Sequence, residues 1–331
     1  MKILILGAES PKVHVLEQRH LDQIRALGED IELHAPLASN SEEVQAHLAE
    51  AEVLAGFPSD LAEISLASAP KLKWIHSFSA GMERVLTPEL KESNITVSNS
   101  SGVHAIPIAE YVLACSFLFA KKFYQSFQNQ QKKIWQPLDG MTEIRDATML
   151  VVGLGRIGKE IAKVTAGAGM YVIAIDQALR LAALAQGKPE FVRELYVMEQ
   201  MEEVLPKADY VVLSLPATAE THHLFDAKKF RIMKKSAVLM NTGRGELIHE
   251  QELIEALRQN VIAGAALDVT EEEPLPYNSP LWGMDNVVIT PHHSSHTKKR
   301  MDRTIDLFCD NIKAYTRGEK LITLVDKQKG Y

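Results

Sequence analysis

The segment that most constrains the fold is 148–176, TMLVVGLGRIGKEIAKVTAGAGMYVIAID. An apolar run predicts a buried strand, the pattern Gly153-x-Gly155-x-x-Gly158 opens a helix, and a second apolar run ends in Asp176. This order is typical of a βαβ unit that binds a dinucleotide. Gly153 permits the tight turn, Gly155 lets the backbone approach a pyrophosphate, and Gly158 lets the helix pack closely on its strand.

The same segment indicates which dinucleotide binds. The start of the predicted helix offers free N–H groups and a positive dipole end to phosphates. A carboxylate at Asp176 can accept hydrogen bonds from both ribose hydroxyls of NAD and would repel the 2′-phosphate of NADP. The alternatives are a helix cap or a solvated turn residue at Asp176, and a 2′-phosphate bound by the nearby Arg180. We predict NAD, with NADP less favoured.

Apolar runs of strand length alternate with helical patterns along most of the chain, which indicates parallel sheets covered by helices. The expected strands are 3–7, 31–35, 53–56, 74–78, 96–99, 148–152, 171–175, 210–215, 236–240, 265–269 and 287–290. Helices are expected around 11–27, from Ser41, over 104–123, within 246–260 and over 298–315, and a looser stretch at 124–146. That stretch is too long for an ordinary turn, so we expect it to pack on another subunit.

The length of 331 residues favours two domains. The first hundred residues and the last thirty or so flank the nucleotide-binding pattern, so the chain should cross twice between the domains. We expect a substrate-binding domain formed by 1–102 and 296–331, and an NAD-binding Rossmann domain formed by 103–295.

Bulk properties exclude several classes of protein. A net charge of −7 argues against binding to nucleic acid or to a lipid surface. The two cysteines, Cys115 and Cys309, lie far apart in the sequence and fit free thiols in a reducing compartment. The start, MKILILGAES, is too short in its apolar part for a signal peptide, and the apolar stretch 105–120 contains Glu110 and is shorter than a membrane span. We therefore expect a cytoplasmic protein.

Charged residues follow several of the predicted strands, where ligands gather in such sheets. Arg244 lies between Gly243 and Gly245, which we expect to leave room for a substrate. Its guanidinium fork matches a carboxylate, although a surface arginine in a turn is the alternative. Asp268 ends the next strand, and the three glutamates at 271–273 are of a kind that most often forms a solvated acidic turn.

Three histidines stand in TPHHSSHT, residues 290–297. A metal site is not expected, because HHxxH after a strand that ends at a proline lacks helical spacing and has no cysteine nearby. We expect His293 and His296 on the surface. His292, fixed after Pro291 at a strand end, favours acid–base work, since a neighbouring carboxylate would stabilise its charged form and fix its tautomer. We assign no role to His222 and His223.

Taken together, these segments resemble the D-isomer-specific 2-hydroxyacid dehydrogenases over essentially the whole chain. The matching segments are VVGLGRIGKEIA with Asp176, SLPATAETHHLF, MNTGRGELI, AALDVTEEEPLP, SPLW and VVITPHHSSHT. The resemblance implies an α/β fold in which a Rossmann nucleotide-binding domain is inserted into a smaller, flavodoxin-like substrate-binding domain.

The resemblance also implies roles for individual residues. Arg244 would hold the substrate's carboxylate and carbonyl, and Glu273 would be the acid paired with the catalytic His292. The substrate-binding residues would be Ser79, Ala80, Gly81, Arg244 and His292. The cofactor-binding residues would be Gly153, Gly155, Arg156, Ile157, Gly158, Asp176, Leu215, Pro216, Thr221, Thr242, Gly243, Asp268, His292, Ser294 and Ile108.

The function implied is the NAD-dependent reduction of a small 2-oxo acid to a D-2-hydroxy acid, and the reverse, by a homodimer formed through 104–145. Phosphoglycerate, formate and phosphonate dehydrogenases are rivals within the same chemistry. An NAD-sensing, corepressor-like binding protein without turnover is the rival from another class. His104, Thr270 and the run 293–295 depart from the usual family residues, so the substrate stays open.

Overall fold

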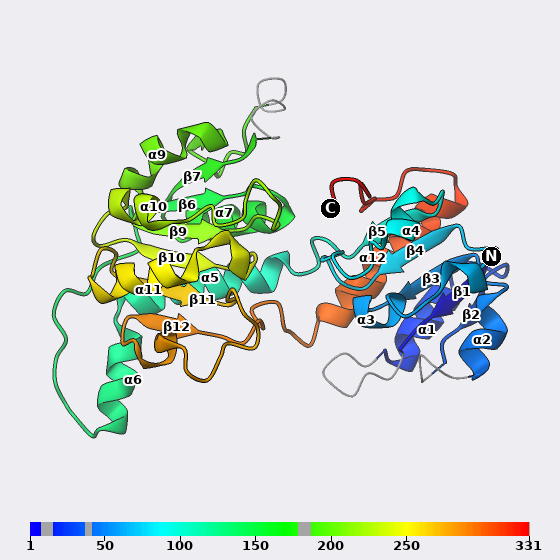
Figure 1. Cartoon of the computed structure of the whole chain (residues 1–331), viewed down its shortest axis with the longest axis horizontal. Helices are drawn as coiled ribbons and strands as arrows, with labels where there is room; N and C mark the ends of the chain where they lie inside the picture. The colour runs from blue at the N-terminus through cyan, green and yellow to red at the C-terminus, as the bar shows by residue number, and fades with distance from the viewer. Residues whose placement is uncertain (8–15, 37–41, 178–186, 331) are drawn as a thin grey trace. The chain divides into compact units, whose positions relative to one another are not determined.

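The computed structural model describes residues 1–7, 16–36, 42–177 and 187–330. The chain forms two compact units (Figure 1). Unit 1 comprises Met1–Val103 and Thr297–Tyr331, and unit 2 comprises His104–His296. At each crossing the unit changes one residue later than the boundary expected from the sequence.

Unit 2 is built on a seven-stranded parallel sheet with the order β12-β11-β10-β9-β6-β7-β8. Its strands are β6 (Thr148–Val152), β7 (Tyr171–Ile175), β8 (Glu194–Tyr196), β9 (Tyr210–Leu213), β10 (Val238–Asn241), β11 (Gly264–Leu267) and β12 (Val287–Ile289). When the strands are numbered within the unit and the sheet is read from β8, the order is 3-2-1-4-5-6-7. It begins with the 3-2-1-4 order of the Rossmann fold. The predicted fold class is therefore confirmed for this unit.

Helices cover both faces of this sheet. The helices of unit 2 that the structure describes are α5 (Ala105–Ala120), α6 (Phe123–Gln131), α7 (Arg156–Gly167), α9 (Met201–Val204), α10 (Ala227–Ile232) and α11 (Glu250–Arg258), of which α6 extends away from the sheet (Figure 1). Met149 and Val151 of β6 pack in a cluster with residues of α5 and α7, whereas Leu150 and Val152 pack in another with residues of α10 and α11. Because alternate side chains enter two different cores, the strand is apolar throughout, as parallel strands usually are.

Among the described residues of unit 2, helix α6 and strand β8 lie where the sequence did not predict a helix or a strand. Helix α6 lies in the stretch expected to be loose, and it is separated from α5 by Lys122, whose φ of 51° ends the first helix. None of its residues is buried, and its aromatic residues end at Phe127, so its polar second half shows no helical spacing of apolar residues in the sequence. Strand β8 is a three-residue edge strand with only partly buried side chains, and it therefore lacks an apolar run.

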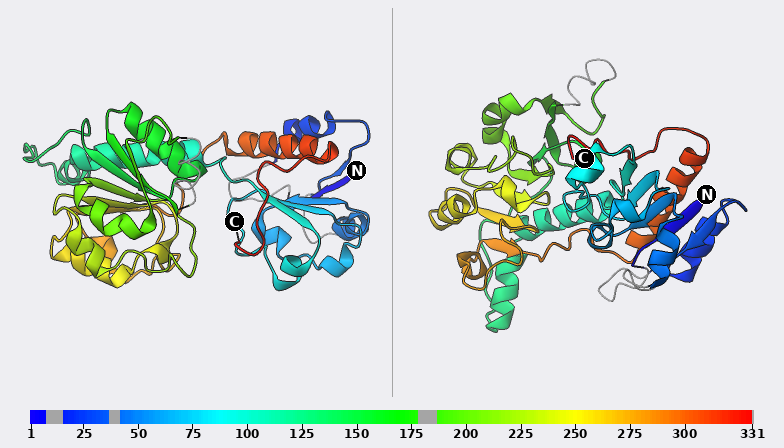
Figure 2. Two further views of the ribbon diagram at one scale, coloured as in Figure 1. Left: turned by 90° about the horizontal axis from the view of Figure 1, so that it is seen from above. Right: turned by 45° about the vertical axis from the view of Figure 1, so that its right-hand side comes forward.

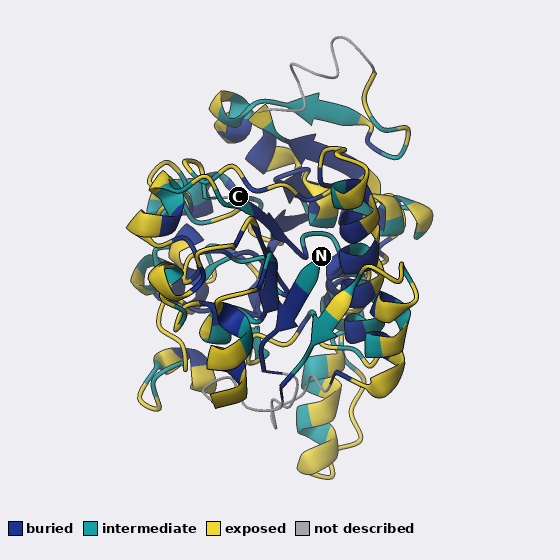
Figure 3. Cartoon of the chain, turned by 90° about the vertical axis from the view of Figure 1, so that its right-hand side faces the viewer, coloured by how far each residue is buried: buried dark blue, intermediate teal, exposed yellow. Residues whose placement is uncertain are grey.

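Unit 1 contains a five-stranded parallel sheet with the order β2-β1-β3-β4-β5, which is the flavodoxin-like order. The strands are β1 (Lys2–Ile5), β2 (Glu32–His34), β3 (Val53–Gly56), β4 (Trp74–Ser77) and β5 (Thr96–Asn99). The helices are α1 (Gln18–Arg25), α2 (Glu42–Leu48), α3 (Pro58–Leu61), α4 (Pro88–Glu92) and α12 (Arg300–Thr316). Figure 3 shows the largely buried strands of this unit between helices with exposed outer faces.

The C-terminal part of the chain completes unit 1. Helix α12 lies beside α1 (Figure 2), and its Ile305, Phe308 and Ile312 belong to the same core cluster as Ile3 and Ile5 of β1. Beyond the helix, the backbone N–H of Val325 donates to the carbonyl oxygen of Val97 at 2.9 Å. Both ends of the chain therefore share one core.

The core of unit 1 contains a histidine, His76, with no exposed surface. Its Nε2 lies 3.3 Å from the Ser100 hydroxyl, which itself donates to the Ser77 carbonyl, so Nε2 carries the proton. Its Nδ1 then accepts from the Ser98 hydroxyl at 2.7 Å, and its ring stacks on Phe308. Burial lowers the pKa of His76 to about 3, so the ring is neutral in the folded protein.

Protonation of His76 should make the stability of unit 1 depend on pH. In the unfolded chain His76 takes up a proton as pH falls below 6.5. In the folded protein His76 stays neutral until pH approaches its pKa of about 3. Stability is therefore fully present above pH 6.5 and is lost as pH falls below it. Between pH 6.5 and 5 the free energy of unfolding should decrease with a slope that approaches about 1.4 kcal/mol per pH unit.

The measurement is urea unfolding followed by tryptophan fluorescence, because Trp74 in unit 1 is fully buried whereas Trp135 and Trp282 are exposed. His76→Asn, which cannot take the proton, should flatten the slope. Equal slopes for this variant and the wild type would contradict the prediction.

Candidate active site

In the glycine loop after β6, two of the three glycines are required because a side chain there would clash with the protein's own backbone, and the third is not. A Cβ on Gly153, whose φ is 95°, would lie 2.5 Å from the carbonyl oxygen of Ser214. A Cβ on Gly158 would lie 1.9 Å from the carbonyl oxygen of Gly153. A Cβ on Gly155, the N-cap of α7, would meet nothing within 4 Å. The open side of the loop thus lies at the first turn of the helix.

Asp176 follows β7 directly, and its Oδ2 accepts a hydrogen bond from the backbone N–H of Leu154 at 2.8 Å. The carboxylate therefore lies beside the glycine loop. Arg180, the residue that could favour a 2′-phosphate, lies outside the described residues.

The other residues expected at the cofactor follow neighbouring strands or begin a helix. Leu215 and Pro216 come after β9, where the Thr221 hydroxyl closes the turn by donating to the Pro216 carbonyl at 2.8 Å. The Thr242 hydroxyl after β10 donates to the Leu213 carbonyl at 3.1 Å.

Two helices carry the remaining candidates for cofactor contact. Arg156 and Ile157 open α7 directly after Gly155. Ile108 lies in the first turn of α5, where it is buried and packs in the core on one face of the sheet.

Arg244 follows β10 in a turn fixed by Asn241. The side-chain amide of Asn241 donates to the Arg244 carbonyl at 2.8 Å and accepts from the Gly243 N–H at 3.0 Å. One guanidinium nitrogen, Nη1, donates to the Gly243 carbonyl at 2.9 Å. The guanidinium is thereby oriented by its own turn.

The glycines on either side of Arg244 do not leave room for a substrate, and that expectation was wrong. A Cβ on Gly243 would lie 2.8 Å from the Leu215 carbonyl oxygen, and one on Gly245 would lie 1.9 Å from the Thr270 carbonyl oxygen. Protein backbone fills both spaces. The close approach of Gly245 instead packs the arginine turn against the start of the loop that leads to Glu273.

Glu273 and His292, far apart in sequence, form a pair. The Nδ1 atom of His292 lies 2.8 Å from Oε2 of Glu273, and the other carboxylate oxygen accepts from the Thr270 N–H at 3.3 Å. The side chain of His292 is 51% exposed. Its Nε2 has no hydrogen-bond partner within the described part of the chain, so that nitrogen can exchange a proton with a ligand.

A hollow of about 580 Å³ opens beside this pair. His292 and Glu273 contribute polar groups to its lining, and Leu275, Trp282 and Ile289 contribute apolar ones. The arrangement places a proton carrier at the wall of a mostly apolar space, as expected of a small-molecule site.

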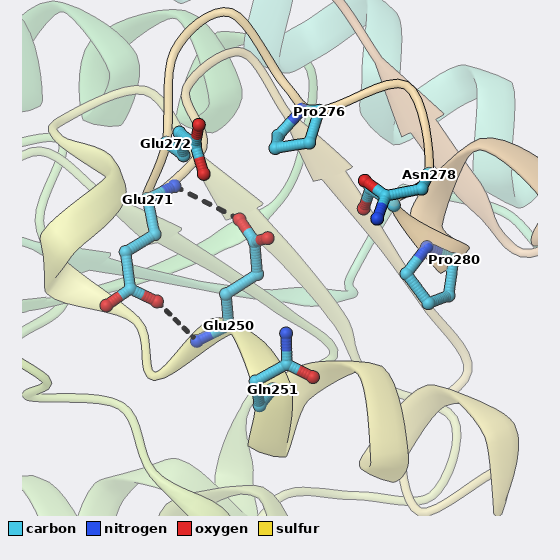
Figure 4. A pocket seen from close by; sticks show the side chains of 8 residues that line it. Glu250, Gln251, Glu271, Glu272, Pro276, Asn278 and Pro280 are labelled. Carbon is cyan, nitrogen blue, oxygen red and sulfur yellow. Dashed lines mark hydrogen bonds between the residues drawn. The ribbon is translucent and has the colours of Figure 1, made fainter.

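A second hollow, of about 290 Å³, is acidic (Figure 4). Its Glu271 and Glu250 exchange hydrogen bonds: each backbone N–H donates to the other's carboxylate, at 3.0 Å from Glu271 and 3.2 Å from Glu250. Burial, and then the charge of Glu271, raises the pKa of Glu250. The acidic run is thus not merely solvated, because Glu271 and Glu273 are both engaged.

The histidines without an assigned role lie near Glu271. His223 Nε2 is 2.6 Å from Oε1 of Glu271, and its ring stacks on His222 at 3.9 Å and packs near His249 at 4.7 Å. Across the described ranges, no group of three His, Cys, Asp or Glu residues is arranged to hold a metal ion.

The predicted substrate loop, Ser79 to Gly81, lies in unit 1 after β4. The side chain of Asn99 donates to the Ala80 carbonyl at 2.9 Å, and the Ser100 N–H donates to the Ser79 carbonyl at 3.1 Å. The N–H groups of Ala80 and Gly81 donate to no atom of the described residues, which leaves them available to an anion. The sequence reasoning missed Asn99 and Ser100, for which only their position after a strand was a signal.

Two further observations bear on the class of protein. Both cysteines are buried and unpaired, as expected. In the portion of the chain that the structure describes, every helix is too short or too polar to span a bilayer.

Comparison with known proteins decides the family. The sequence model of the NAD binding domain of D-isomer specific 2-hydroxyacid dehydrogenases matches residues 113–294, more than half of the chain. The chain belongs to the D-isomer specific 2-hydroxyacid dehydrogenase family. The predicted family is therefore confirmed. Members of this family are NAD(P)-dependent oxidoreductases.

Similar proteins extend this assignment over the chain. A glyoxylate reductase of Thermofilum pendens is 34% identical over 267 residues, which cover 79% of this chain and 77% of that protein. A family member from Aeromonas salmonicida has a TM-score of 0.83 at 29% identity, covering 98% and 99% of the two chains. A Xanthobacter autotrophicus member in complex with NADPH has a TM-score of 0.80 at 25% identity, covering 100% and 99%.

Two glycines of α7 allow a matched test of the loop. Gly158→Ala should force the helix away from β6 and lower the stability of unit 2 by about 1–3 kcal/mol. Gly167→Ala, at the other end of the same helix, adds a Cβ that meets nothing within 4 Å and should be tolerated. Urea unfolding compares the two, and equal stability would show that the helix is not packed as described.

Proposed function

We propose that this chain reduces a small 2-oxo acid to the D-2-hydroxy acid with NADH, and also catalyses the reverse oxidation. The observation that carries the proposal is the 2.8 Å contact between Glu273 Oε2 and His292 Nδ1 at the strand ends of unit 2. This pairing leaves Nε2 of His292 as the group that can give or take a proton.

The glycine loop fits a dinucleotide. Gly155 leaves open space at the first turn of α7, where the helix dipole and the N–H groups that a helix start presents favour a pyrophosphate. Asp176 beside the loop would bind the ribose hydroxyls and disfavour a 2′-phosphate, which supports NAD over NADP. A reduced nicotinamide, when bound, supplies the hydride. In this proposal unit 2 is the NAD-binding domain and unit 1 the substrate-binding domain.

The remaining chemistry belongs to side chains and amides of this chain. Arg244 would bind the substrate's carboxylate and polarise its carbonyl, with Ser79, Ala80 and Gly81 also binding the carboxylate. His292 would donate its Nε2 proton to the developing alkoxide, and Glu273 would stabilise the imidazolium. In the oxidative direction His292 would accept the proton. Proton transfer of this kind is typically worth about 10²–10⁴ in rate.

The test is a steady-state assay with NADH and with NADPH against glyoxylate, hydroxypyruvate, pyruvate and longer 2-oxo acids. We expect turnover with at least one acid, and a higher kcat/KM with NADH. Tight NADH binding without turnover on the whole panel would contradict this proposal and support an NAD-sensing binding protein.

The matched variants for this assay are His292→Gln and His293→Gln, which alter neighbouring exposed residues. His292→Gln should lower kcat by about 10²–10⁴ while NADH affinity stays nearly unchanged. His293→Gln should leave kcat unchanged. Full turnover in His292→Gln would remove this residue from the mechanism.

We also propose a cytoplasmic homodimer formed through 104–145. Several apolar side chains of this region are exposed in the single chain, among them Phe127 at 57% and Trp135 at 100%. Exposed apolar side chains concentrated in one region of the sequence favour a protein partner. Sedimentation equilibrium should give twice the mass of the chain, and Trp135→Ser with Phe127→Ser should shift it to the monomer. A monomeric wild-type protein would contradict the dimer.

A further inference from the structure

We propose that Asp268, Thr290 and Tyr111 are positioning residues that hold the backbone on both sides of His292 and so aim its imidazole. This inference rests on the proposed function, in which His292 carries the proton. It assigns Asp268 a role that acts through His292, and it adds two residues for which no role was expected.

Asp268 is a buried carboxylate, 2% exposed, whose oxygens are occupied by donors of one short segment. Its Oδ1 accepts from the Thr290 hydroxyl at 2.6 Å and from the His293 N–H at 3.0 Å. Its Oδ2 accepts from the Ser294 N–H at 3.1 Å and from the Ser294 hydroxyl. A carboxylate has about four lone-pair sites, so these contacts account for the hydrogen-bonding capacity of the group.

The residues that donate hydrogen bonds to Asp268 lie on both sides of His292 in the sequence. Thr290 precedes His292 by two residues, and Ser294 follows it by two, and both bind the same carboxylate. The N–H of His292 itself donates to the backbone carbonyl of Asp268 at 2.8 Å. Side chain and backbone of Asp268 together fix the entire segment.

The segment needs such support because His292 has a φ of 49°, in the left-handed region. Residues with a Cβ adopt this region rarely and at a cost in free energy that the surrounding contacts must offset. The ring is about half exposed, so packing around the side chain does not fix its direction. Its aim toward Glu273 therefore depends on the backbone.

Tyr111 extends the network to helix α5. The hydroxyls of Thr290 and Tyr111 lie 3.0 Å apart. Thr290 has one hydroxyl proton, and the charged acceptor Asp268 at 2.6 Å takes it. The Thr290 hydroxyl thus lies within hydrogen-bonding distance of both Tyr111 and Asp268, which gives a chain of contacts from Tyr111 through Thr290 to Asp268. Chains of this kind strengthen each member.

Tyr111 is suited to be the fixed end of this chain. Burial, followed by the nearby Cys115, raises the pKa of Tyr111 far above its usual range, so the phenol stays a donor. Burial also raises the pKa of Cys115 to about 11, so no thiolate competes. Helix α5 is anchored by Ala109 and Val112, which have no exposed surface.

The test compares conservative and disruptive variants of the chain. Thr290→Val keeps the shape but removes the hydroxyl, and should lower kcat by about 10- to 100-fold with little change in KM for the oxo acid. Thr290→Ser restores the hydroxyl and should recover most of kcat. Tyr111→Phe should lower kcat by about fivefold, the rate equivalent of one hydrogen bond.

The control is Tyr210→Phe. Tyr210 is buried, whereas Tyr111 is partly buried, and the Tyr210 hydroxyl lies against α5, 3.5 Å from the Ser116 carbonyl. Among the described residues it makes no hydrogen bond to the segment 290–294. This variant should keep the wild-type kcat. If kcat fell equally in Tyr111→Phe and Tyr210→Phe, the loss would reflect disturbed packing rather than the network, and the proposal would be overturned.

Hydrogen–deuterium exchange provides a readout that does not depend on turnover. The N–H groups of His293 and Ser294 donate to Asp268, so they should exchange at least about tenfold faster in Thr290→Val than in Thr290→Ser or Tyr210→Phe. Unchanged exchange together with unchanged kcat would overturn the positioning role. A wild-type protein without turnover would refute the proposed function alone, and exchange would still decide whether this network holds the segment.

Discussion

Burial of both faces of each parallel sheet decides where polar chemistry can occur in this chain. In β6, alternate residues enter different apolar cores, so no position within the strand can carry a functional polar group without the cost of burying it. Polar residues therefore appear where strands end. The glycine loop, Arg244, Asp268 and His292 all follow carboxyl ends of the unit 2 sheet, which brings them to one edge.

The same constraint explains how much of the fold could be predicted. Strands β6 and β7 were predicted to the residue because each is a continuous apolar run that stops at a turn residue, Gly153 after β6 and Asp176 after β7. Strand β8 was missed because an edge strand is half-buried and has no such run. Helix α6 was missed because its aromatic residues end at Phe127 and its second half is entirely polar, so the helical spacing of apolar residues is too short to indicate a helix.

Some contacts of the candidate site could be predicted from the sequence and others could not. The Glu273–His292 pair was expected from the resemblance, and the geometry brings the two residues together. The hydroxyl contact between Thr290 and Tyr111 joins residues 179 positions apart and has no local pattern that could announce it. The glycines beside Arg244 were misinterpreted because the sequence shows that a space exists, but not whether a ligand or the protein's own backbone fills it.

The return of the chain to unit 1 has a consequence for its synthesis. The strands β1 to β5 leave the ribosome long before α12, whose Ile305, Phe308 and Ile312 cover one face of their sheet. Until then that face, which includes Trp74, has no complete cover. The inserted unit 2 can fold first, while the incomplete unit 1 exposes an apolar surface. Such a surface is prone to aggregation and is of the kind that chaperones bind.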